Sequence, residues 1–482
     1  MKRKLFAAVL ALLVAAVAFA APLKKSVTWE KIRRYPAPLP VLGTLEPVKS
    51  DLSKPSWWSV GSETLDRDYA KFDNYVQYMG ETGVGYARLQ SGWAKSEPKK
   101  GKYNFGWIDH QVDALIEQGI HPWICLCYGN PLYTDKGIDL NAKLFGDGPV
   151  MDAWLKYVRE VVKRYKGKVT MYEVWNEPDG AKDANGKWGT NWDEYALLFV
   201  RTAKVIREED PDVKIAAFGA FSILQEYYVK GMAKIKELGG ADLADYVTYH
   251  AYWANPDRLT EPVSKLVNDC KEFNPNVRLL QGESGCPAQL EYGHALANKE
   301  WTEYSQIKWD LRHMLVNFSL GIPSSVFTMV DLDYGWMQQS FGLIRTNGKG
   351  EPVYKRPKFY GMQHMTSIIT GDVKPVHTIT ISDINTYNQL SKVGLERDGK
   401  TFGYLLWFSG NEPNSSLTRE LINLSVWGAD IKDPVYVDMV SGYVHDISRN
   451  YQLLPGNGIK FTGLPLWDAP ILIIDRSEIN FK

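Results

Sequence analysis

Two glutamates end short apolar runs of this 482-residue chain, at points where strands of a parallel sheet would stop. Glu177 is followed at once by Pro178, and Glu283 comes soon after the apolar pair Leu279 and Leu280. Glycoside hydrolysis needs two carboxyl groups that flank one bond: one gives a proton to the leaving oxygen, and the other attacks the anomeric carbon or activates water. A surface or ion-paired carboxylate is the alternative at each position. The apolar runs favour the first interpretation, so we predict that Glu177 and Glu283 are catalytic.

Eight alternations of an apolar run with an amphipathic stretch lie between residue 57 and about residue 370. This rhythm is typical of βα units, and eight units close a TIM barrel, the (β/α)8 fold. The predicted strands are Trp58–Ser62, Val84–Gln90, His121–Tyr128, Val169–Asn176, Val213–Gly219, Tyr246–Tyr252, Val277–Glu283 and Ser324–Asp331. The active site of such a barrel lies at the carboxyl ends of its strands. Strands four and seven face each other there, so the two glutamates can reach one cleft.

Three of the connecting stretches carry helix signals of their own. Residues 109–119 place Val112, Leu115 and Ile116 on one face and end at Gly119, as a helix with a glycine cap should. Residues 195–208 and 301–320 are also predicted to be helical, and each is followed by a turn that contains proline.

Beyond Gly371 the hydrophobic period changes to two, which is typical of strands. Strands are predicted at Thr386–Glu396, Thr401–Phe408, Leu417–Val426, Pro434–Val440 and Ala469–Asp475. Asp398 and Gly399 predict a tight hairpin between the first two, because both residues tolerate a positive φ. Residues 371–482 are therefore predicted to form a β-sandwich accessory domain. Residues 21–56 are expected to run along the surface or to add a strand to that domain.

The first twenty residues have the three regions of a signal peptide. Lys2, Arg3 and Lys4 are basic, residues 5–17 are apolar, and Ala18 and Ala20 fit the pattern that signal peptidase reads. An uncleaved anchor is the alternative, but the apolar stretch is short for a bilayer. We expect a secreted or periplasmic protein that has no membrane contact after cleavage.

Composition narrows the function classes further. The 56 basic residues equal the 56 acidic ones, which argues against a nucleic-acid partner, and the 45% hydrophobic content argues against disorder. The four cysteines, Cys125, Cys127, Cys270 and Cys286, lack the spacing of a zinc site. Buried free thiols are favoured over disulfides because a chain of this length can build its core without cross-links.

The segment Trp175–Pro178 resembles the Asn-Glu-Pro signature that ends the fourth barrel strand in clan A of the glycoside hydrolases. Residues 93–105, 195–213, 306–321 and 341–343 are similar to family 39 and its relatives. The resemblance extends over the barrel, and a β-sandwich is a common appendage in that family. It implies that Glu177 is the general acid/base and Glu283 the nucleophile, with net retention of the anomeric configuration.

The resemblance also implies roles for neighbours of the two carboxylates. Asn176 would hydrogen-bond the sugar 2-hydroxyl, and Arg88 would keep Glu283 ionised. His250 and Tyr252 alternate on the sixth strand and would hydrogen-bond the nucleophile or the acid. The alternatives are a barrel salt bridge for Arg88 and a buried side chain that merely satisfies a neighbour for His250.

Three further residues are expected to contact substrate. Tyr128 and Asn130 follow the third strand, and the active site of a TIM barrel lies at the carboxyl ends of its strands. The eighth strand lacks the tryptophan that forms the floor of the sugar site in the relatives. Trp336 in the next loop could replace it, because an aromatic face packs well against a pyranose. Packing beneath its own loop is the alternative for Trp336.

These inferences predict an exported retaining β-glycoside hydrolase that acts by double displacement on an oligo- or polysaccharide of a plant, alga or host. No metal or redox cofactor is expected. The alternatives are an endo-β-glycanase of the same clan and a carbohydrate-binding barrel that has lost turnover. The sugar, its linkage and the oligomeric state stay open.

Overall fold

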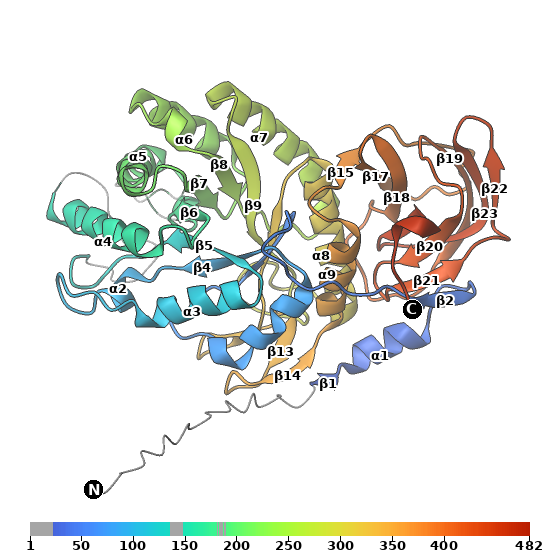
Figure 1. Cartoon of the computed structure of the whole chain (residues 1–482), viewed down its shortest axis with the longest axis horizontal. Helices are drawn as coiled ribbons and strands as arrows, with labels where there is room; N and C mark the ends of the chain where they lie inside the picture. Colours follow the sequence, from blue (N-terminus) through green and yellow to red (C-terminus); the bar gives the residue numbers. More distant parts are fainter. Residues whose placement is uncertain (1–22, 135–147, 181, 183–186, 188) are drawn as a thin grey trace, which may run out of the picture.

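The computed structural model describes residues 23–134, 148–180, 182, 187 and 189–482. Figure 1 shows a barrel surrounded by helices on one side and antiparallel sheets, coloured orange to red, on the other. The predicted signal peptide, residues 1–20, lies outside the described residues. Among the residues that are described, no helix combines the length and the apolar character needed to cross a membrane.

Eight parallel strands close into a barrel, with neighbours in the order β10-β3-β4-β5-β6-β7-β8-β9. Their bounds are β3 (Trp58–Gly61), β4 (Tyr86–Gln90), β5 (His121–Leu126), β6 (Met171–Val174), β7 (Lys214–Ala220), β8 (Tyr246–Tyr249), β9 (Arg278–Ser284) and β10 (Ser324–Val326). Each strand begins within two residues of its predicted start. The TIM barrel expected from the eight apolar runs is confirmed.

Helices cover the outside of the barrel (Figure 1). They are α2 (Trp93–Ser96), α3 (Gly106–Glu117), α4 (Pro149–Tyr165), α5 (Trp192–Glu209), α6 (Gln225–Glu237), α7 (Thr260–Phe273), α8 (Glu303–Ser319) and α9 (Pro357–Ile368). In α4 a proline occupies the first turn, where its missing N–H costs nothing, and Trp154, Val158, Val161 and Tyr165 form one buried face.

Two antiparallel sheets follow the barrel. The larger has the order β15-β17-β18-β24-β20-β21-β2 and the smaller the order β16-β19-β23-β22. Their strands are β2 (Val41–Thr44), β15 (Lys374–Val376), β16 (Thr380–Ser382), β17 (Leu390–Arg397), β18 (Lys400–Phe408), β19 (Glu420–Trp427), β20 (Pro434–Asp438), β21 (Tyr443–Asp446), β22 (Tyr451–Leu454), β23 (Gly458–Leu466) and β24 (Ile471–Asp475). Asp398 and Gly399 have φ values of 52° and 75° in the β17–β18 turn, as the hairpin signal requires.

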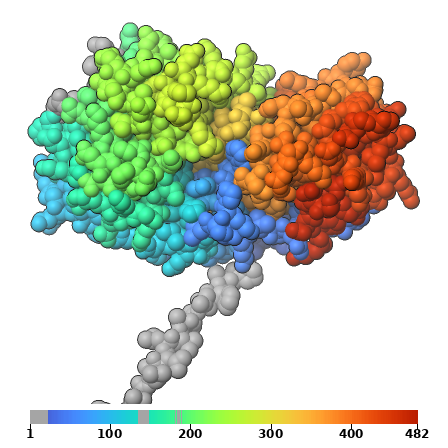
Figure 2. All heavy atoms as spheres, turned by 45° about the horizontal axis from the view of Figure 1, so that its top comes forward, coloured from blue at the N-terminus to red at the C-terminus, as the bar shows by residue number. Residues whose placement is uncertain are grey.

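The N-terminal segment connects both parts of the molecule. Strand β2 pairs with β21 at the edge of the larger sheet, and α1 (Val27–Arg34) precedes it along the chain. Before α1, β1 (Lys24–Lys25) pairs with β14 (Pro352–Lys355), which in turn pairs with β13 (Ile344–Thr346). In the loop after the last barrel strand, β11 (Leu332–Asp333) pairs with β12 (Gln338–Gln339). Figure 2 shows this blue segment lying across the barrel and the orange-to-red sheets.

Helix α8 is buried along nearly its whole length because it lies between the barrel and the sheets (Figure 1). Arg312 of α8 donates from Nε to the carboxylate of Asp257, at 2.7 Å, and from Nη2 to the carbonyl of Asn411, at 2.9 Å. Trp407 of the larger sheet donates to the same Asp257 carboxylate at 2.7 Å. A buried charge that is paired on both sides of a junction fixes the two parts against each other.

All four cysteines are buried and free. Cys125 lies in β5 and packs in the barrel core, where a small apolar side chain fits.

Candidate active site

A pocket of about 720 Å³ opens at the carboxyl ends of the barrel strands. Every one of the eight strands contributes to its wall, through its last residues or the loop that follows. Glu177 and Glu283 both line it, so the structure brings the two predicted carboxylates together. The lining residues that matter for the chemistry are Glu63, Arg67, Gln90, Tyr128, Asn176, Glu177, Tyr252 and Glu283.

Glu177 is held at a sharp bend of the chain after β6. Its φ is 50° and that of Trp175 is 71°, a left-handed conformation that residues other than glycine rarely adopt. The Glu177 amide donates to the carbonyl of Gly219 at 2.8 Å, which fastens this bend to the next strand. Such local strain persists only where the surrounding structure enforces it, and it is common at functional sites.

The two carboxylates meet around His250. One oxygen of Glu177, one oxygen of Glu283 and a ring nitrogen of His250 all lie within 4.8 Å of one another. His250 Nδ1 is 3.0 Å from Glu177 Oε1 and 3.8 Å from Glu283 Oε1. The imidazole is fully buried and therefore contacts both carboxylates from behind the pocket wall.

Glu283 is fixed from two sides. Arg88 Nη1 donates to Glu283 Oε2 at 2.8 Å, and the Tyr252 hydroxyl donates to Glu283 Oε1 at 2.7 Å. Each carboxylate oxygen thus has one strong donor, and a charge-assisted bond of this kind restricts rotation of the side chain.

Arg88 serves a wider network than the sequence predicted. Its Nε donates to Glu173 at 3.0 Å, its Nη1 also approaches Glu63 at 3.3 Å, and its Nη2 donates to the amide oxygen of Asn176 at 2.7 Å. The guanidinium is fully buried and does not line the pocket. We conclude that Arg88 orients the groups around the cleft from behind its wall.

The surroundings of the two catalytic candidates shift their pKa values in opposite directions. Burial raises the pKa of Glu177, and although His250 opposes this, the charge of Glu283 adds to the increase. Burial also acts to raise the pKa of Glu283, but the charges of His250 and Arg88 and the hydrogen bond from Tyr252 outweigh it, so this pKa lies below the usual value. Two carboxyl groups whose pKa values are pushed apart suit the roles of acid and nucleophile.

Asn176 and Tyr128 lie where the sequence placed them. Both line the pocket, and the Asn176 amide donates to the Tyr128 hydroxyl at 2.8 Å. Because its oxygen accepts from Arg88, the amide of Asn176 is fixed in one orientation. His250 and Tyr252 also lie beside the two carboxylates, as the alternation on the sixth strand predicted.

Two predicted residues lie elsewhere. Asn130 is buried and does not line the pocket, because its amide bonds the backbone of Trp93, Glu97 and Leu132 and so holds a loop together. Trp336 also lies outside the pocket wall and is 68% exposed. Its ring stacks on His294, at 5.4 Å between centroids, and His294 does line the pocket.

Glu63 is the main residue that the sequence reasoning missed. It follows β3, lines the pocket and shares Arg88 with Glu283. Burial, together with the charge of Glu283, raises the pKa of Glu63 to about 7 although Arg88 opposes the shift. The rule that directed attention to the carboxyl ends of strands four and seven could have found it at the end of the first strand.

Glu177, His250 and Glu283 form the one cluster in the described residues whose ligand atoms could hold a metal ion. Arg88 already contacts the Glu283 carboxylate, and a guanidinium at that distance repels a second cation. The donor set therefore suits acid–base chemistry better than metal binding.

Comparison with known proteins agrees with this geometry. Residues 69–267 match the model of the glycosyl hydrolases family 39. Endo-1,4-beta-xylanase B of Humicola insolens is 22% identical over 172 residues, which are 36% of this chain and 46% of that protein. An intracellular exo-alpha-(1->5)-L-arabinofuranosidase of Streptomyces lividans is 26% identical over 141 residues, 29% of this chain and 20% of that protein. The chain thus spans less than half the length of these curated relatives.

Solved structures share the fold. A family 39 glycoside hydrolase from the gut symbiont Bacteroides cellulosilyticus WH2 superposes with a TM-score of 0.64 at 17% identity, over 89% of this chain and 83% of that one. The catalytic domain of GH30 xylanase C from Talaromyces cellulolyticus gives a TM-score of 0.57 at 11% identity, over 90% and 98%. The match over residues 69–267 and the barrel around two paired glutamates agree: this part of the chain is similar to the glycosyl hydrolases family 39.

Proposed function

We propose that the protein is an exported β-glycoside hydrolase that cleaves an oligo- or polysaccharide by double displacement with net retention. The observation that carries the proposal is the pair Glu177 and Glu283, whose nearest oxygens lie within 4.8 Å and whose pKa values are shifted in opposite directions. Retaining enzymes hold their carboxyl groups about 5 to 5.5 Å apart, whereas inverting ones need about 6.5 to 9.5 Å to admit a water. The short separation supports retention.

The mechanism then has two steps. In the first, protonated Glu177 gives its proton to the leaving oxygen while the Glu283 carboxylate attacks the anomeric carbon, and a covalent glycosyl-enzyme forms. In the second, ionised Glu177 takes a proton from water, which attacks the same carbon and releases Glu283. Arg88 and Tyr252 hold the attacking carboxylate in place, and Asn176 is positioned to bond the sugar 2-hydroxyl.

Export is part of the proposal because the first twenty residues combine a basic start, an apolar stretch and a small-residue cleavage pattern. Detection of the mature protein in the medium or periplasm, with its new N-terminus determined by mass spectrometry, tests it.

Azide rescue tests the two catalytic roles separately. In Glu177→Ala the glycosyl-enzyme on Glu283 accumulates with aryl glycosides whose leaving group is acidic, and azide attacks it to give a β-glycosyl azide. Glu283→Ala has no nucleophile, so any azide product from it has the α configuration. If the two variants give the opposite products, the two roles are reversed. If neither responds to azide, the proposed site is wrong.

An endo-acting glycanase is the second candidate. Phe221 and Trp253 line the pocket and are 44% and 40% exposed, so they offer aromatic faces beyond the sugar that sits between the carboxylates. Product analysis separates the two candidates, because an endo-enzyme releases mixed oligosaccharides from a polymer whereas an exo-enzyme releases one small sugar from its end.

A further inference from the structure

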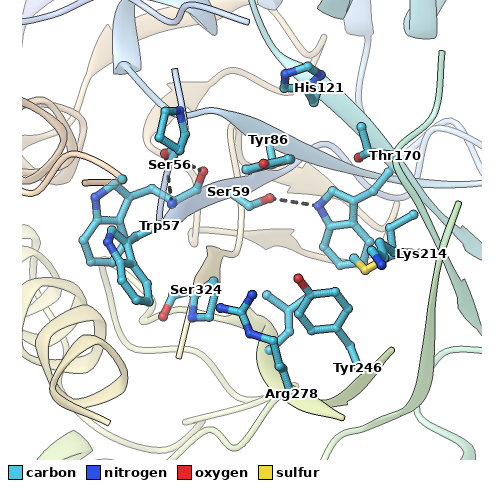
Figure 3. A pocket seen from close by; sticks show the side chains of 17 residues that line it. Ser56, Trp57, Ser59, Tyr86, His121, Thr170, Lys214, Tyr246, Arg278 and Ser324 are labelled. Atoms are coloured by element: carbon cyan, nitrogen blue, oxygen red, sulfur yellow. Dashed lines mark hydrogen bonds between the residues drawn. The ribbon is translucent and has the colours of Figure 1, made fainter. Parts of the chain in front are cut away.

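A second cavity, of about 470 Å³, lies at the opposite end of the barrel. The first residue of each of the eight barrel strands lines it, so it occupies the amino-terminal opening (Figure 3). Its volume falls in the range of about 300 to 1,000 Å³ that small-molecule sites have. The proposed hydrolysis uses none of its residues.

Aromatic side chains form much of its wall. Tyr86 and Tyr246, at the starts of β4 and β8, are both half-buried and pack against a cluster formed by Trp123, Met171, Ala216 and Leu280. This small apolar cluster is separate from the main core of the barrel. Trp57 adds a fourth ring (Figure 3). Aromatic faces with polar edges suit the C–H face of a sugar ring.

Ser59 lies among these rings. It accepts a hydrogen bond from the Trp123 ring nitrogen at 3.0 Å, which Figure 3 marks with a dashed line. Ser325 in turn donates to the Ser59 hydroxyl at 3.2 Å, so this polar group is tied to the wall of the barrel.

The charged side chains that line the cavity are all basic. Its lining contains Lys214, Arg278 and His121 but neither aspartate nor glutamate. Lys214 is neutralised by Asp245 at 2.9 Å. The Arg278 guanidinium lies 5.9 Å from the centre of the Tyr246 ring and forms no ion pair with any described carboxylate. Arg278 is therefore a free cation beside an aromatic face.

We propose that the amino-terminal opening of the barrel is a second, non-catalytic site that binds an acidic monosaccharide, a single sugar ring with a carboxylate or phosphate group. The ring packs between Tyr86 and Tyr246, and the acidic group pairs with Arg278. A guanidinium fork donates hydrogen bonds to a carboxylate or a phosphate alike, so the chemistry is shared by uronates and sugar phosphates.

Calorimetric titration of the full chain tests this site with four probes: glucuronate, glucose 6-phosphate, glucose and benzoate. We expect saturable binding of glucuronate, glucose 6-phosphate or both, and at least about tenfold weaker binding of the other two, because glucose lacks the anion and benzoate lacks the hydroxyls. The stronger of the two acidic sugars identifies the acidic group. Equal binding of benzoate or glucose overturns the assignment.

Variants separate this site from the catalytic pocket, which could also admit a sugar. Arg278→Gln should weaken binding of the acidic sugar at least about tenfold. Arg278 is exposed, so its variant should fold, and circular dichroism checks this. Arg449→Gln, a change at an exposed arginine of the C-terminal sheets, is the matched control and should bind as the unaltered chain does. Affinity that survives Arg278→Gln, or the absence of saturable binding by either acidic sugar, overturns the proposal.

Discussion

The two openings of the barrel are built from opposite chemistry. At the carboxyl ends of the strands, Glu63, Glu177 and Glu283 line the pocket together with Arg67, and Arg88, which pairs with Glu63 and Glu283, is buried behind the wall. At the amino ends, basic and aromatic residues line the cavity and no carboxylate is among them. Both sets of residues are contributed by the same eight strands. All eight strands run in the same direction, so their carboxyl ends line one opening and their amino ends line the other. One barrel can therefore carry an acidic reactive cleft at one opening and a cationic cavity at the other.

The largest expected effect follows loss of the nucleophile at the acidic opening. Glu283→Gln should lower kcat on any glycoside at least about a thousandfold, because the variant cannot form the covalent intermediate. It also removes a negative charge that raises the pKa of Glu177. An NMR titration should therefore find the Glu177 pKa lower in this variant than in the unaltered protein. An unchanged pKa would show that the two carboxylates are not coupled.

Loss of the acid/base should depend on the leaving group. We expect Glu177→Gln to reduce kcat/KM about 10² to 10⁴-fold on alkyl glycosides, which need protonation, and far less on glycosides of acidic phenols. Steady-state rates over a series of leaving groups measure this. A uniform loss across the series would contradict an acid role for Glu177.

Removing the buried cation should affect both stability and pH dependence. Arg88→Gln leaves Glu63, Glu173 and Glu283 close together without a counter-charge, at a cost of about 3 to 5 kcal/mol in the free energy of unfolding. The lowered pKa of Glu283 means that its pairing stabilises the fold above the ordinary glutamate pKa and that this contribution is lost as pH falls through the lowered value. Without Arg88 the Glu283 pKa rises, so the acid limb of kcat/KM should move to higher pH. Urea unfolding measures the change in stability, and a pH–rate profile measures the shift of the acid limb. In both measurements Arg88→Lys should give a value between those of the unaltered protein and Arg88→Gln.

A smaller effect is expected at Tyr252. Tyr252→Phe removes one hydrogen bond, 2.7 Å long, to the Glu283 carboxylate and leaves the ring in place. Hydrogen bonds to charged groups contribute about 1.5 to 3 kcal/mol, so kcat/KM should fall roughly 10 to 100-fold. The acid limb should again shift to higher pH, by less than in Arg88→Gln. A change in KM with no change in kcat/KM would argue against a role in holding the nucleophile.

The smallest effect completes the comparison. Arg278→Gln alters the cationic opening only, so hydrolysis should stay within about twofold of the unaltered rate and stability within about 0.5 kcal/mol, as for most exposed substitutions. Initial rates and thermal unfolding measure the two. A large loss of hydrolysis would mean that the two openings are coupled, and the contrast drawn between them would fail.

The local pattern of residues was sufficient for much of the barrel and for the catalytic pair. Alternation of apolar runs with amphipathic stretches depends on burial of each element against its neighbours, so it located all eight barrel strands and the Asp398-Gly399 hairpin. The Asn-Glu-Pro segment and Glu283 were readable because each follows an apolar run at a strand end. Strands β21, β22 and β23 were not predicted. The four residues of β21 carry two buried side chains, Val444 and His445, between half-buried neighbours, and β22 has no buried residue, so neither gives a clear alternation of apolar and polar positions.

Tertiary structure alone decided the rest. It selected, of the two outcomes expected for residues 21–56, the one in which β2 joins the larger sheet, buried Asn130 within a loop, and left Trp336 outside the pocket wall, because these outcomes depend on contacts between residues distant in sequence. The same holds for the three carboxylates around Arg88 and for the aromatic, cationic opening at the other end. The sequence pattern predicts the start of each strand to within two residues and its end less closely, since β10 ends at Val326 and not at Asp331. Only closure of the barrel brings eight such ends to one place, where their charges act on one another.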